Sequence, residues 1–173
     1  MAAAPTTSRS SWRGRSRAAC DAPRVSPGGA PLDGCPQCGA QYANAGDSCA
    51  SRFAQLLALD HSRQAPWGPL HGLAFSAYVL QHSAEHTASL ERCWLMAYRV
   101  TVAGDDPSRL ANALRRTRDA TLESFDAPPL PHGTPPTRFA LTIADLGDFA
   151  AADYAMRCRM WARSAINAWR TPR

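Results

Sequence analysis

The chain has 173 residues, enough for one folded domain with tails and too few for two full hydrophobic cores. Hydrophobic residues make up 45% of it, which excludes disorder throughout, and no apolar run reaches the roughly 20 residues of a membrane-spanning helix. The net charge is +5, carried entirely by arginine and partly concentrated near the N-terminus, so the concentrated basic face of a nucleic-acid-binding domain is not indicated.

Residues 1–34 are predicted to be a disordered tail rich in arginine, proline and serine, followed by a single helical domain over residues 35–171. The tail holds five arginines against Asp21 and Asp33, a net charge of +3. No apolar segment follows its arginines, so a secretory signal is not indicated, and a reducing, cytoplasmic location is expected. A transit peptide or a wrongly chosen start site remains an alternative for this segment.

The next residues alternate between helical stripes and breakers, and alanine (33 residues) far outnumbers valine plus isoleucine (six), which favours helices over a sheet. Helices are expected over residues 48–62, 69–82, from 83 or 87 to 102, 107–121 and 148–170. Residues 139–143 are expected to form a short strand or an extended strap. The predicted fold class is mainly α: a compact antiparallel bundle of about five helices, fronted by a small cysteine loop resembling a zinc knuckle.

The cysteine loop carries the clearest chemical signal. Cys35 and Cys38 are separated by two residues, so one tight turn can direct both thiolates at a tetrahedral metal ion, and Gly39 can adopt the backbone conformation that such a turn needs. Cys49 lies at the expected start of the first helix, where the helix N-terminus favours a thiolate. The pattern predicts a Zn²⁺ site; a redox dithiol and unligated thiols are the alternatives.

A structural zinc site needs a fourth ligand, and we expect His71 to supply it from the start of the second helix. His61 lies about 18 Å from Cys49 along the first helix, which excludes joint ligation by an unbroken helix. A water molecule or a substrate could fill the position instead.

One face of the second helix carries histidines at both ends. His71 and His82 are about 16 Å apart along it, too far to bind one ion together, and Asp60 is close enough in sequence to orient His71. In the purely structural interpretation, both histidines are hydrogen-bonded residues of the core or its rim. The functional alternative is a metal-dependent enzyme, a hydrolase or a thiol-handling transferase. Its pocket would hold Asp60, His71, Tyr78 and His82, with Cys93 as an optional ligand or nucleophile.

With these residues in view, the chain resembles an uncharacterised family of small bacterial proteins, a domain of unknown function. The matching segments are Cys35-Pro-Gln-Cys38-Gly39, Cys49, His71 through Tyr78 to Gln81-His82, and Trp161-Ala-Arg through Ala168-Trp169. Phe75-Ser76 stands where the family tends to show Val-Asp, and Ser83 where it tends to show proline. The resemblance implies the fold, and no activity comes with it.

Together these observations predict a zinc-binding helical protein whose cysteine-rich site is structural, with enzymatic activity left open. No membrane partner is expected, and a homo-oligomer is allowed. Nucleic-acid binding through Trp12 and the arginines of residues 9–17 is the weaker alternative, because such tails are usually only solvated.

Overall fold

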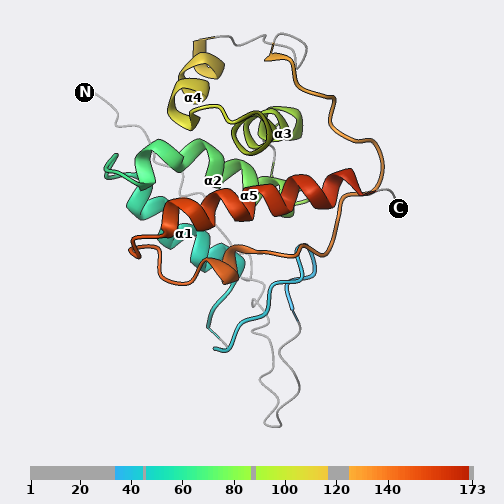
Figure 1. Cartoon of the computed structure of the whole chain (residues 1–173). Helices are drawn as coiled ribbons and strands as arrows, with labels where there is room; N and C mark the ends of the chain where they lie inside the picture. Colours follow the sequence, from blue (N-terminus) through green and yellow to red (C-terminus); the bar gives the residue numbers. More distant parts are fainter. Residues whose placement is uncertain (1–33, 45, 87–88, 117–124, 172–173) are drawn as a thin grey trace, which may run out of the picture. The chain divides into compact units, whose positions relative to one another are not determined.

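The computed structural model describes residues 34–44, 46–86, 89–116 and 125–171 (Figure 1). The predicted tail, apart from Gly34, lies outside the described residues and stays a prediction. The helices are α1 (Cys49–Asp60), α2 (Trp67–Gln81), α3 (Leu90–Tyr98), α4 (Pro107–Arg116) and α5 (Tyr154–Arg170). A π-helix (Arg99–Ala103) continues α3, and a 3-10 helix (Ile143–Leu146) precedes α5. No strand occurs in the described part of the chain, so the mainly helical fold class is confirmed.

Helix α2 lies at the centre of the fold. It contacts α1, α3, α4 and α5, which surround it in Figure 1. Because neighbours cover most of its circumference, its buried residues are not confined to one stripe. The largest side chains buried around it include Trp94, Tyr154 and Trp161. This central position makes both ends of α2 meeting points for other segments.

The tryptophans of the helices fasten irregular segments as well as filling the core. Each of the four in the described residues donates its indole N–H to an oxygen, as buried tryptophans usually do. The bonds are Trp67 to the Phe149 carbonyl (3.0 Å), Trp94 to the Pro128 carbonyl (2.8 Å), Trp161 to Gln81 Oε1 (2.9 Å) and Trp169 to the Leu80 carbonyl (2.9 Å). Of residues 139–143, expected as a strand or a strap, residues 139–142 are irregular, held by Gln81 through the Leu141 carbonyl (2.7 Å), and Ile143 begins the 3-10 helix.

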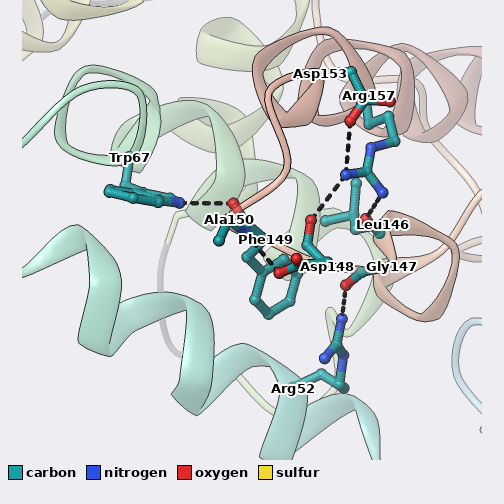
Figure 2. A network of polar contacts seen from close by, with 9 residues as sticks. All are labelled: Arg52, Trp67, Leu146, Gly147, Asp148, Phe149, Ala150, Asp153 and Arg157. Atoms are coloured by element: carbon teal, nitrogen blue, oxygen red, sulfur yellow. Dashed lines mark hydrogen bonds and ion pairs between the residues drawn. The ribbon is translucent and has the colours of Figure 1, made fainter.

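Residues 147–153 form a loop that enters α5, here called the α5 leader loop (Figure 2). Arg157 donates to the Leu146 carbonyl and to the Asp148 carbonyl (2.8 Å), and Arg52 donates to the Gly147 carbonyl. Phe149 is buried, with the Arg52 guanidinium 4.1 Å above its ring. The expected helix start at Asp148 is therefore wrong. The loop carbonyls are bonded by distant side chains, and the helix begins only at Tyr154.

Local signals explain several of the other helix ends, although α3 begins at Leu90 after the Ser89 cap rather than at residue 83 or 87. Ser48 and Ser51 form a reciprocal capping box at the start of α1, and Asp106 Oδ1 accepts from the Arg109 backbone N–H (2.8 Å) at the start of α4. The third expected helix reaches residue 103, but its last turn is π-helical and ends at Gly104, which has a φ of 85°. Among the described residues, no helix combines the length and apolarity needed to cross a membrane.

Candidate metal centre

Residues 35–40 form a tight turn, here called the cysteine knuckle. The Cys35 backbone N–H donates to the Ala40 carbonyl (2.8 Å), and the Gly39 N–H donates to the Cys35 carbonyl (2.8 Å). Gly39 has a φ of 80°, a left-handed conformation that costs glycine nothing and strains other residues. The turn closes on itself and brings Cys35 and Cys38 onto the side of the knuckle that faces the helices.

Two helix ends complete the group. Cys49 is the first residue of α1, held there by the Ser48 cap, and its Sγ lies 3.5 Å from Cys38 Sγ. His82 is the residue at which α2 ends, and its Nε2 lies 3.6 Å from Cys35 Sγ. Segments far apart in the sequence therefore meet at one point.

The four ligand atoms all lie within 4.8 Å of one another, a spacing that could hold a metal ion. Zinc bonds of about 2.3 Å to sulfur and about 2.0 Å to nitrogen, at the tetrahedral angle, place two sulfurs about 3.8 Å apart and a sulfur and a nitrogen about 3.5 Å apart. The distances of 3.5 Å between the sulfurs of Cys38 and Cys49, and of 3.6 Å between Cys35 Sγ and His82 Nε2, match this geometry within a few tenths of an ångström.

Neighbouring groups orient the donors. His82 Nδ1 donates to the Tyr78 carbonyl (3.0 Å), which assigns the proton to Nδ1 and leaves the Nε2 lone pair for a ligand bond. The Tyr78 ring stacks on the imidazole with 4.2 Å between ring centroids. The Tyr42 hydroxyl donates to Cys49 Sγ (3.2 Å), a bond that favours the thiolate. Such supporting bonds are typical of metal sites.

Without a cation, the buried sulfurs share protons. The hydrogen bond from Cys38 lowers the pKa of Cys49 to about 4, against the opposing effect of burial, and the nearby His82 imidazole and the Tyr42 hydroxyl add to the lowering. The same Cys49 contact, with burial, raises the pKa of Cys38 far above its usual range. Cys49 is therefore the one of this pair that loses its proton more readily, and a bound cation would favour loss of the proton from Cys38 as well.

In the comparison with protein families, residues 33–170 match the family of unknown function DUF5946. The chain belongs to DUF5946. The matched region begins just before the cysteine knuckle and ends at the last residue of α5, so it includes the whole Cys/His group. No curated protein and no solved structure matches the chain.

In this DUF5946 chain the fourth member of the group is His82, not the expected His71. His71 Nδ1 lies 2.9 Å from Asp60 Oδ2, and its side chain is 48% exposed. The knuckle meets the C-terminal end of α2, whereas His71 lies near the N-terminal end, which excludes it from the group. Asp60 does orient His71, as its sequence position suggested.

The residues expected to share one enzyme pocket lie in different places. Tyr78 and His82 belong to the surroundings of the thiols, whereas Asp60 and His71 line a cavity against α4. Cys93 is buried, and desolvation raises its pKa to about 11, so its thiol is a weak nucleophile. His71 and His82 thus do not face one cavity, the arrangement that the enzyme alternative requires.

Proposed function

We propose that this protein binds one Zn²⁺ ion through Cys35, Cys38, Cys49 and His82, and that the ion is structural. The observation that carries the proposal is the convergence of three sulfurs and one imidazole nitrogen within 4.8 Å of one another, with two of the pairs at the spacing of a tetrahedral zinc site. The ion would join the cysteine knuckle to the start of α1 and to the end of α2. These three segments are separate in the sequence, so the ion would link them as a tertiary contact.

The donor set favours zinc over other divalent ions. Thiolate and imidazole ligands suit zinc, whereas magnesium and calcium prefer oxygen. A tetrahedral set of three sulfurs and one nitrogen is one of the common structural zinc sites. Tyr42 and the Tyr78 carbonyl supply the outer bonds that such a site needs.

Closure and burial favour a structural role over a catalytic one. Catalytic zinc sites use three protein ligands and keep a position for water or substrate, whereas this group offers four. Cys38 and His82 are at most 1% exposed, Cys49 is buried, and Cys35 alone of the four is partly exposed, which leaves a substrate little room to approach. Three reduced thiols also suit a reducing compartment, which supports a cytoplasmic location.

The test is elemental analysis of the purified full-length protein together with X-ray absorption at the zinc edge. We expect one zinc per chain, with three sulfur ligands at about 2.3 Å and one nitrogen ligand at about 2.0 Å. Cys38→Ser and His82→Gln should each lower zinc retention under mild chelation, and His82→Gln should also remove the nitrogen from the absorption spectrum.

Matched controls separate ligands from other residues of the same type. Cys93→Ala and His71→Gln change a cysteine and a histidine outside the group, so both should retain one zinc with the same ligand shell. A protein that folds without bound metal would overturn the proposal. A spectrum that loses its nitrogen in His71→Gln rather than in His82→Gln would overturn the ligand assignment.

A further inference from the structure

A second polar cluster lies at the opposite end of α2 from the thiols. The Asp60 side chain is only 3% exposed, and its Oδ2 lies 2.9 Å from His71 Nδ1. Because a carboxylate only accepts hydrogen bonds, the proton is on Nδ1. The His71 ring is thus fixed by a buried partner, and Nε2, the nitrogen that Asp60 does not use, remains available to a ligand.

This pair borders a cavity of about 980 Å³ between the end of α1, the start of α2 and α4. The volume is at the upper end of what small-molecule sites usually have. Gly68 lines the cavity in close approach to the turn after α1, since a Cβ there would lie 2.7 Å from the Arg63 backbone. Ser108 and Asn112 add a hydroxyl and an amide from α4.

The charges around the cavity are unbalanced. Its ionisable residues are Asp60, His61, Arg63, His71 and Arg115. Asp60 is the one carboxylate among them, and His71 already engages it. The two guanidinium groups, together with the imidazole when it is protonated, therefore outnumber this carboxylate and leave the lining with an excess of positive charge. Guanidinium forks bind phosphate oxygens in pairs, and such an excess suits a phosphate dianion better than a carboxylate monoanion.

We propose that this cavity binds the phosphate group of a small phosphorylated metabolite, with Arg63, Arg115 and His71 Nε2 contacting its oxygens. The site does not depend on the zinc proposal. His71 and His82 are eleven residues apart on α2, about 16 Å along the helix axis. The Asp60 bond favours a protonated His71, since it is the main cause that raises the pKa of this imidazole, while Arg115 nearby opposes it. In that state Nε2 donates to a phosphate oxygen.

The test is calorimetric titration of the full-length protein, metal-loaded as purified, with three probes: inorganic phosphate, glycerol 3-phosphate and acetate. We expect both phosphates to bind and acetate, a monoanion, to bind at least about tenfold more weakly. Tighter binding of glycerol 3-phosphate than of inorganic phosphate would identify a phosphorylated metabolite as the ligand; the reverse order would identify free phosphate.

Variants of exposed residues locate the binding without disturbing the core. Arg115→Gln should weaken phosphate binding about tenfold, whereas Arg116→Gln, one residue further along α4 and outside the cavity lining, should change it less than twofold. Added phosphate should shift the NMR signals of the His71 ring and leave those of the exposed His132 unchanged. Absent binding at about 1 mM phosphate, or equal loss in the two arginine variants, would overturn the proposal.

Discussion

Two irregular segments are fastened to the helices of this protein in different ways. The α5 leader loop is held by arginine and tryptophan donors that bond its backbone carbonyls, and by the burial of Phe149. The cysteine knuckle has its own internal backbone bonds and buries Ala40, and Gln37 donates to Glu85, but its contacts with Cys49 and His82 at the helix ends are made by sulfur and imidazole atoms. Thiol contacts are weak hydrogen bonds, whereas guanidinium–carbonyl bonds are charge-assisted.

The difference indicates which segment stays ordered without a metal ion. The leader loop is held entirely by hydrogen bonds and burial, so its order should follow the stability of the whole domain. If the proposed metal site is filled, a cation would join the sulfurs of the knuckle to Cys49 and His82 and attach the knuckle firmly. Metal should therefore control one segment and leave the other unchanged.

The largest expected effect comes from metal removal. A chelator that strips zinc should lower the midpoint of thermal unfolding by on the order of 10 °C, because a ligand at about 1,000 times its Kd stabilises the folded state by about 4 kcal/mol. In hydrogen exchange followed by mass spectrometry, residues 34–44 should lose protection while residues 147–153 keep theirs. Equal loss in both segments would show that the two fastenings are not independent.

An intermediate effect is expected from Arg157→Met. This change removes the donors to the Leu146 and Asp148 carbonyls and the ion pair with Asp153 (2.9 Å), and should lower the free energy of unfolding by about 2 kcal/mol. Urea titration measures the loss. Zinc content should stay at one ion per chain, and exchange should rise in residues 147–153 only. Arg159→Met, two residues along the same helix, is the matched control and should cost much less.

The smallest effect is expected for the Asp60–His71 pair, a contact that attaches neither the leader loop nor the cysteine knuckle. Asp60 raises the pKa of His71 above its usual range, so the protonated imidazole is favoured in the folded protein. The stabilisation from this pair is full below the ordinary histidine pKa of about 6.5 and is lost as the pH rises through the raised value. The difference in unfolding free energy between wild type and His71→Gln should thus be larger at about pH 6 than at about pH 8.

A direct NMR titration of the imidazole checks the cause. His71 should titrate above the ordinary histidine value in the wild type, and Asp60→Asn should bring it down, with Arg115 lowering it further. An unchanged His71 titration in Asp60→Asn would contradict the assignment. Neither His71→Gln nor Asp60→Asn should change the zinc content, or the hydrogen exchange of the cysteine knuckle and the α5 leader loop.

The sequence predicted most of the helices because their ends carry local signals. Ser48 and the Asp106-Pro107 pair mark helix starts, and the observed α1 and α4 begin there. The start of α5 could not be found this way. It is displaced to Tyr154 because Arg52 and Trp67, which lie 95 and 82 residues before the carbonyls they bond, hold the leader loop outside the helix. Such long-range competition leaves no trace in local periodicity.

In the candidate site, too, some features follow from the local sequence and others depend on tertiary contacts. The three thiols follow from spacing and from a helix start, which are local features. The choice between His71 and His82 depends on which end of α2 the knuckle meets, a tertiary contact that spacing does not encode. The expected position of His82 at the end of the second helix was the one sequence feature that could have pointed to it as the fourth ligand. Its backbone N–H and its Nδ1 both bond the Tyr78 carbonyl, so the residue that ends the helix is also oriented by it.

Because His82 ends α2 and is oriented by it, the length of this helix fixes where the imidazole lies relative to the sulfurs. One residue inserted between His71 and His82 would rotate His82 by about 100° and move it about 1.5 Å along the axis. The imidazole would swing away from the sulfurs, while the contact between Asp60 and His71 would survive. Length changes among natural DUF5946 proteins are therefore expected in the connections outside α2, and an engineered insertion offers a way to disable one end of the helix while sparing the other.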